Sequence, residues 1–119
     1  MNEIEIHRLD TLIEEHAETK LIAMIDGKFV GTMGVEFDGL TVASFRQLFV
    51  EVEERRRGIA TALIEEACAI ATDAGCVAIN ASLSDENHVL YADFYRPLGF
   101  VLAFKRPGCA ATIARPLNP

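Results

Sequence analysis

The amino-acid sequence predicts an α/β (α+β) fold in which helices flank a mixed, mostly antiparallel central sheet. Two Asp-Gly pairs, at residues 26–27 and 38–39, separate β-rich segments and are typical of tight hairpin turns. Residues 59–74 repeat apolar side chains at helical spacing, and further apolar, β-rich segments follow them. One sheet with helices packed on its faces accommodates these patterns.

The N-terminal segment is predicted to contain a short strand followed by a short helix. Residues 4–6 alternate apolar and charged side chains, as a half-buried strand does. Asp10 could then cap a helix that continues to about Glu18. Three apolar residues lie on one side of this predicted helix: Leu12, Ile13 and Ala17.

Three antiparallel strands are predicted to follow. Residues 21–25 and 29–37 read as strands that are joined by the turn at residues 26–27. The second Asp-Gly pair leads into a third strand, which runs on to about Val52. Tight turns join neighbouring strands, so these three strands should be adjacent in the sheet.

Residues 59–74 form the clearest predicted helix. Gly75 follows them as the expected C′ residue, where a left-handed backbone ends many helices. The apolar positions that recur at helical spacing are Ile59, Leu63, Ala67, Ile70 and Ala74.

The C-terminal part is predicted to add a buried strand, a second helix and a closing hairpin. Residues 76–83 are apolar and β-rich, and residues 85–95 read as a helix. Pro97 cannot continue that helix, because it removes a hydrogen bond and crowds the preceding turn. Residues 100–104 and 110–115 then read as paired strands, which gives the order β-α-β-β-β-α-β-α-β-β.

Composition favours one globular, cytoplasmic domain that spans residues 1–119. Half of the residues are hydrophobic, which is typical of a chain with a packed core. No apolar run approaches the about 20 residues that a membrane helix requires, and the N-terminus lacks the basic and apolar regions of a signal peptide. Three cysteines without a C-x-x-C spacing suggest reduced thiols and no metal site.

The charge balance limits the kinds of partner that we expect. A formal net charge of −7 disfavours nucleic-acid binding, which relies on broad basic surface. The same charge is compatible with a cationic acceptor such as an amine.

A glycine-bearing, arginine-rich turn stands between the third of these antiparallel strands and the helix of residues 59–74. Unpaired backbone N–H groups and the helix dipole favour an anion at such a junction, and a glycine there lets a ligand approach the backbone closely. Neither a Walker loop nor a three-glycine dinucleotide fingerprint is present in the turn. The segment therefore predicts a phosphate site formed by Arg55, Arg56, Arg57, Gly58, Ile59, Ala60 and Thr61.

Two motifs together resemble the GNAT superfamily of N-acetyltransferases. The pattern R-x-x-G-x-A, formed by Arg55, Gly58 and Ala60, is similar to the pyrophosphate loop of that superfamily. Residues 94–100 read Phe-Tyr-Arg-Pro-Leu-Gly-Phe and are similar to its F/L-Y-x-x-x-G-F signature. The resemblance implies an acetyl-CoA-dependent N-acetyltransferase that moves an acetyl group to an amine of a small molecule or a protein, by direct attack in a ternary complex.

The resemblance also implies a set of cofactor contacts. Backbone N–H groups of the loop from Arg55 to Thr61 would hold the pyrophosphate of coenzyme A, with the arginine side chains assisting. A bulged fourth strand that splays from the fifth would free backbone groups of Phe49 and Val50 for the pantetheine and the carbonyl. Asn87, near the start of the last helix, would contact the cofactor.

Catalytic roles follow from the same resemblance. Tyr95 matches the tyrosine that lies near the cofactor sulfur in the superfamily, and it is the expected general acid, with Tyr91 as the runner-up. Glu51 and Glu53 are the candidate bases, because alternate positions at the end of a strand project to the same face.

Two further charged residues bear on the identity of the base. Glu36, on the preceding strand, is a third candidate. Arg46 occupies the place on the fourth strand where relatives often carry a catalytic acid, which puts direct carboxylate catalysis in question. The alternative function is therefore a catalytically weak or inactive coenzyme A-binding or protein-interaction module.

The segment between the first two predicted strands is short for the superfamily, whose members usually carry two helices there. Only residues 7–20 are available in this chain. The shortening implies an open acceptor site, a large acceptor such as a protein, or a partner chain that completes the wall. A homodimer is therefore one expected state.

Overall fold

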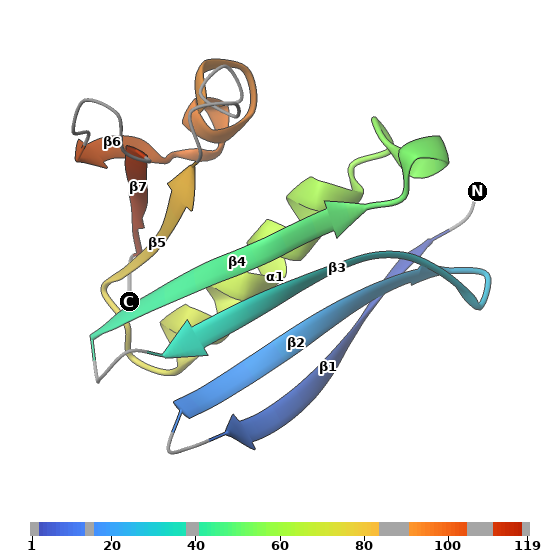
Figure 1. Ribbon diagram of the computed structural model, residues 1–119, viewed down its shortest axis with the longest axis horizontal. Helices are drawn as coiled ribbons and strands as arrows, with labels where there is room; N and C mark the ends of the chain where they lie inside the picture. Colours follow the sequence, from blue (N-terminus) through green and yellow to red (C-terminus); the bar gives the residue numbers. More distant parts are fainter. Residues whose placement is uncertain (1–2, 14–15, 38–40, 84–90, 105–110, 118–119) are drawn as a thin grey trace.

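A seven-stranded sheet with one long helix on one face forms the body of the protein (Figure 1). The computed structural model describes residues 3–13, 16–37, 41–83, 91–104 and 111–117. The strands are β1 (Ile4–Ile13), β2 (His16–Ile25), β3 (Lys28–Phe37), β4 (Val42–Val50), β5 (Ala78–Leu83), β6 (Val101–Phe104) and β7 (Ala111–Pro116). The helix is α1 (Ile59–Asp73), and short turns form η1 (Val52–Glu54), η3 (Tyr91–Tyr95) and η4 (Arg96–Leu98).

The order of the strands confirms a mixed, mostly antiparallel sheet. Their order across the sheet is β1-β2-β3-β4-β5-β7-β6. The first four strands form an antiparallel meander, whereas β4 and β5 are parallel and are joined through α1. This connection is needed because parallel neighbours cannot be joined by a tight turn.

The predicted helix over residues 10–18 is wrong, because this segment belongs to the hairpin of β1 and β2. The two strands pair continuously from Ile4 opposite Ile25 to Ile13 opposite His16. Asp10 does not cap a helix; its Oδ1 accepts a hydrogen bond of 2.7 Å from the Thr19 hydroxyl on the opposite strand. A helix this short is marginal by itself, so pairing with β2 decides the conformation.

The two faces of the sheet are covered differently. Leu21, Met33 and Val35 are fully buried on the face that packs against α1, where Ile59 and Leu63 of the helix meet them in the core. In Figure 1, α1 lies behind β3 and β4, and no described helix lies in front of strands β1 to β4. The front face of these four strands is therefore open in the described part of the chain.

The C-terminal elements largely follow the prediction. β6 and β7 form the closing antiparallel hairpin, although residues 105–110 between them lie outside the described residues. Of the helix predicted over residues 85–95, the structure describes only its end, Tyr91–Tyr95, which is a single π-helical turn. None of the described helices is long and apolar enough to cross a membrane.

We predict that Gly31→Ala destabilises the fold by about 1 to 3 kcal/mol, the range for an overpacked core. A Cβ atom at Gly31 would lie 2.8 Å from the carbonyl oxygen of Phe49 and 3.3 Å from Cγ2 of Ile59, so β4 or α1 would have to move. Urea denaturation measures the change. Gly34→Ala is the matched control on the same strand, since the added methyl group would meet the end of the Glu18 side chain and no backbone atom of a neighbouring strand within 3.8 Å. Equal losses in both variants would contradict the argument.

Candidate active site

A β-bulge interrupts β4 in the middle of the strand. Gly34 of β3 lies opposite Arg46, whereas Thr32, two residues earlier, lies opposite Phe49. One extra residue of β4 is therefore accommodated, and Gln47 takes a left-handed backbone with φ of +58°. A bulge bends its strand and increases the local twist, so the end of β4 is redirected relative to its neighbours.

Beyond this bulge, β4 separates from β5. The two strands pair only where Val42–Ser44 runs beside Ala78–Asn80. Figure 1 shows them diverging from that point, with η1 after the end of β4 and η3 beyond the end of β5. Phe49 and Val50 lie in the separated part and still pair with β3 on the other side. The bulge and the splay implied by the family resemblance are both present.

The loop after β4 leads directly into an uncapped helix N-terminus. Arg56 and Gly58 both have left-handed backbones, with φ of +68° and +82°. Gly58 is the N-cap of α1, and its carbonyl accepts the first helical hydrogen bond, 2.9 Å from the nitrogen of Ala62. No side chain caps this end, and no acidic residue lies in the first turn. The first N–H groups of α1 thus have no intrahelical partner and suit an anion.

The three arginines of the loop have different partners. Nε of Arg55 donates to the carbonyl of Val50 at 3.2 Å, which ties the loop to the end of β4. Arg57 forms an ion pair with Glu54, and Glu54 also lies 3.5 Å from Nζ of Lys28. Within the described ranges Arg56 forms no ion pair or side-chain hydrogen bond. Arg56 is therefore the loop arginine whose guanidinium is available to a phosphate.

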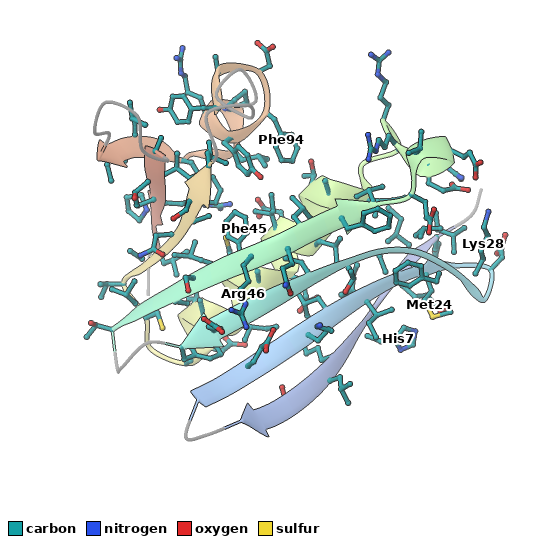
Figure 2. All side chains as sticks on the ribbon, viewed as in Figure 1. His7, Met24, Lys28, Phe45, Arg46 and Phe94 are labelled. Atoms are coloured by element: carbon teal, nitrogen blue, oxygen red, sulfur yellow. The ribbon has the colours of Figure 1, made fainter. Side chains whose placement is uncertain are left out.

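Tyr95 lies in an aromatic cluster beside β4. Its side chain is buried, and its ring centre is 6.2 Å from that of Phe45, 4.8 Å from Phe94 and 5.6 Å from Phe100. In Figure 2, Phe94 projects from η3 toward the end of β4. Burial raises the pKa of Tyr95 above the usual value near 10, so the phenol is protonated at neutral pH.

Tyr91, the runner-up for the acid, is occupied structurally. Its hydroxyl donates to the carbonyl of Phe100 at 3.3 Å, and the guanidinium of Arg96 lies 5.3 Å from the centre of its ring. These contacts hold the η3 and η4 turns against the start of β6. The Tyr91 side chain is therefore engaged within the protein.

The carboxylates are arranged differently from the prediction. β4 ends at Val50, so Glu51 and Glu53 do not alternate on a strand. Glu51 precedes η1 and donates its N–H to the carbonyl of Val30, whereas Glu53 is exposed within η1. The strand geometry expected for this pair is wrong because the 3-10 turn begins directly after the strand. Their role as bases stays a prediction.

Glu36 and Arg46 lie on the open face of the sheet and are paired with each other. An Arg46 nitrogen, Nη2, lies 2.7 Å from Oε1 of Glu36 and 3.5 Å from Oε2 of Glu18. Figure 2 shows Arg46 on the near face, which α1 does not cover. Asn87 and His88 lie outside the described residues.

Sequence reasoning missed two residues that shape this site. Gln47 is the bulge residue, and nothing in the local sequence marks a non-glycine residue for a left-handed backbone within a strand. Glu54 holds Arg57 and Lys28. Its spacing of three residues from Arg57 was a readable signal for the first of these pairs.

A separate hollow of about 440 Å³ lies between the second half of α1 and β7. Its wall includes Cys68, Thr72 and Arg115, and Arg115 donates to Glu65 at 2.7 Å. Burial raises the pKa of the Cys68 thiol, although the nearby arginine acts in the opposite direction. The thiol is therefore protonated and a poor nucleophile at neutral pH.

The chain belongs to the Acetyltransferase (GNAT) family, whose family model matches residues 2–100. No curated protein matches the sequence significantly. Several solved structures share the fold, with sequence identities too low to show more than the fold. In the described part of the chain, no three His, Cys, Asp or Glu side chains gather where they could hold a metal ion.

Three of these structures show how far the similarity extends. Ard1 from Thermoplasma volcanium has a TM-score of 0.73 and 19% identity, over 84% of this chain and 71% of that one. PaiA N-acetyltransferase from Thermoplasma acidophilum, in complex with coenzyme A, has a TM-score of 0.74 and 20% identity, over 83% of this chain and 60% of that one. Nourseothricin acetyltransferase has a TM-score of 0.74 and 16% identity, over 99% of this chain and 89% of that one. This chain thus spans less than two thirds of the length of the PaiA enzyme.

Acetyl-CoA is the cofactor that acetyltransferases of this family use. The local structure fits its pyrophosphate in two respects. The uncapped N-terminus of α1 offers backbone N–H donors, and the space where a Cβ of Gly58 would stand is empty within 4 Å. The available guanidinium of Arg56 adds positive charge at the same loop.

We predict that Gly58→Leu weakens coenzyme A binding at least about tenfold while the protein stays folded. The added side chain meets no protein atom near its Cβ, so it would occupy the approach of the ligand. Calorimetric titration measures the affinity. Gly75→Leu is the matched control at the opposite end of α1, because Gly75 also has a left-handed backbone, with φ of +89°, and open space. Equal affinities of the two variants would show that the loop does not hold the cofactor.

We predict that Arg56→Ala weakens coenzyme A binding by about tenfold, or about 1.4 kcal/mol, and that Arg57→Ala weakens it less. Arg56 is available to the pyrophosphate, whereas Arg57 is held by Glu54. Affinities measured at low and high salt separate the two, because the loss at Arg56 should shrink as salt screens the charge. A larger loss for Arg57→Ala would reverse the assignment.

Proposed function

We propose that the protein is an acetyl-CoA-dependent N-acetyltransferase that acetylates an amine by direct attack in a ternary complex. The observation that carries this proposal is the continuity of the bulged β4, the arginine-bearing loop and the uncapped start of α1. A strand end with unpaired backbone groups leads directly into an anion site. Together these would hold the thioester end and the pyrophosphate of an extended coenzyme A.

The cofactor supplies an activated acetyl group that a neutral amine attacks. The negative charge that develops on the carbonyl oxygen calls for a preorganised donor, and we assign it to the backbone N–H of Val50 in the splayed part of β4. Glu51 donates its N–H to Val30 of β3. By alternation, the N–H of Phe49 also points to β3, and that of Val50 points away from it. One such donor is worth about 3 kcal/mol in related chemistry. The main chain provides it, so the side chain of Val50 remains free for packing.

Tyr95 is the proposed general acid for the departing thiolate. Its raised pKa keeps the phenol protonated, as the role requires. The same shift makes full transfer of the proton less favourable, so much of the stabilisation comes from the hydrogen bond that the phenol donates. Among the described residues no hydrogen bond engages this hydroxyl.

The proposed base is Glu51 or Glu53, acting directly or through a water molecule. Glu51 is the better placed of the two, since its backbone is held by β3 at the point where β4 ends. Glu36 is less suited, because its carboxylate is engaged by Arg46. The acceptor is an amine of a small molecule or a protein, and it would approach from the uncovered face of the sheet.

Calorimetric titration with acetyl-CoA, coenzyme A and ATP tests the cofactor assignment first. Saturable binding of both coenzyme A forms, well above ATP, followed by turnover with a panel of polyamines, amino acids and peptides, would support the proposal. Binding without turnover would favour the module with little catalysis, which the ion-paired Arg46 at the catalytic-acid position would explain. Absence of binding would contradict the enzyme and the coenzyme A-binding module, and would leave a protein-interaction module.

We predict that Tyr95→Phe lowers kcat by about 100-fold with near-normal affinity for acetyl-CoA. An acid must be protonated, so wild-type activity should fall as the pH rises through the pKa of Tyr95, which burial raises above 10. This decline should be lost in the variant, which keeps the aromatic packing. Tyr91→Phe is the matched control and should retain most of the activity. A Tyr95→Phe enzyme with unchanged kcat would remove the residue from this role.

A further inference from the structure

β1 forms a long sheet edge with an unpaired outer side in the described part of the chain. It spans Ile4–Ile13 and stands first in the strand order. The opposite edge, β6, has only four residues and an irregular register. Long regular edges carry a row of unpaired N–H and C=O groups that can pair with another strand, and proteins usually protect them.

We propose that two copies of this chain pair through β1, antiparallel, about a two-fold axis that passes midway between the two copies of Leu9. The pairing would join the two sheets into one and satisfy the backbone groups of both edges. Leu9 is exposed on the open face of the sheet, with 54% of its surface accessible, and it would be covered by its own counterpart. Such an interface is isologous and closes after two copies.

The geometry of strand pairing restricts where the axis can lie. An axis that relates two antiparallel strands of one sheet is perpendicular to the sheet, so residues of the same face must stand opposite each other. Because successive side chains alternate between faces, one residue of β1 has to stand directly opposite its own copy, with the axis between the two copies. Below, an axis at a residue means an axis between the two copies of that residue. Near the centre of β1 the choices are His7, Arg8, Leu9 and Asp10.

Only one of these registers pairs opposite charges. An axis at Arg8 or at Asp10 would place that charge directly opposite its own copy, which is destabilising. An axis at His7 would place Arg8 opposite the partner's Ile6, without a countercharge. An axis at Leu9 places Arg8 opposite the partner's Asp10, and by symmetry this pair occurs twice. The same register also uses nearly the whole strand, from residue 5 to residue 13.

Both charged residues retain capacity for these contacts. Arg8 is exposed and forms an ion pair with Glu66 of α1, and Asp10 is exposed and accepts one hydrogen bond from Thr19. A guanidinium has five N–H donors, and a carboxylate has two oxygens with about four acceptor positions. The contacts within one copy therefore preorganise the two groups without exhausting them.

Sedimentation equilibrium over a wide range of protein concentration tests the proposal. The wild-type chain should show a monomer–dimer equilibrium. Arg8→Asp and Asp10→Arg should each sediment as monomers at concentrations where the wild type is dimeric, because each places like charges opposite each other twice. Mixing the two variants should restore a dimer, since both pairs in the heterodimer are then of opposite charge. A local folding defect in either variant would not be repaired by mixing.

Matched variants separate the interface from effects within one copy. Leu9→Arg should dissociate the dimer, whereas Val77→Arg, at an equally exposed apolar residue in the connection before β5, should not. Glu66→Gln removes only the partner of Arg8 within the chain and should leave the dimer intact. The proposal is overturned by a wild type that stays monomeric up to its solubility limit, by a dimer that survives Leu9→Arg, or by a mixture of the charge variants that stays monomeric.

Discussion

One extra residue in β4 is the feature on which the site depends. The bulge at Gln47 lets β4 keep its pairing with β3 while its end turns away from β5. An unbulged strand would continue the parallel pairing and satisfy the backbone groups that a thioester cofactor needs. The left-handed backbone of a non-glycine residue costs roughly 1 kcal/mol or more, which the surrounding pairing with β3 offsets.

The same constraint positions the phosphate loop. Gly31 of β3 allows the carbonyl of Phe49 and the side chain of Ile59 to approach closely, so the end of β4 and the start of α1 are packed against one residue. Arg55 adds a hydrogen bond to Val50, and Glu54 holds Arg57. The loop is thus braced at both ends, and the first N–H groups of α1 point outward from a fixed position. Local positive charge can exist here although the chain as a whole carries −7.

The sequence predicted most of the fold because its strongest signals are local. Asp26-Gly27 marks a hairpin, and the apolar spacing of α1 agrees with the observed helix nearly to its ends. The failure over residues 10–18 has a different cause: their apolar spacing suits a weak helix, but a strand is preferred once β2 offers a partner edge. Likewise, the bulge at Gln47 and the 3-10 turn after Val50 arise from tertiary packing. The directions of the Glu51 and Glu53 side chains beyond β4 therefore could not be predicted from the alternation of side chains along a strand.

The hairpin that replaces the expected helix also changes what can surround the acceptor. By register, Leu9, Phe29 and Phe49 all lie on the face opposite α1, and each is at least 40% exposed. Apolar groups this accessible gain free energy when another surface covers them. Under the proposed function, no described element of one chain encloses a small acceptor on this face. A large acceptor would itself supply an enclosing surface, and pairing through β1 would extend the open face over two copies while leaving the β4 site of each accessible.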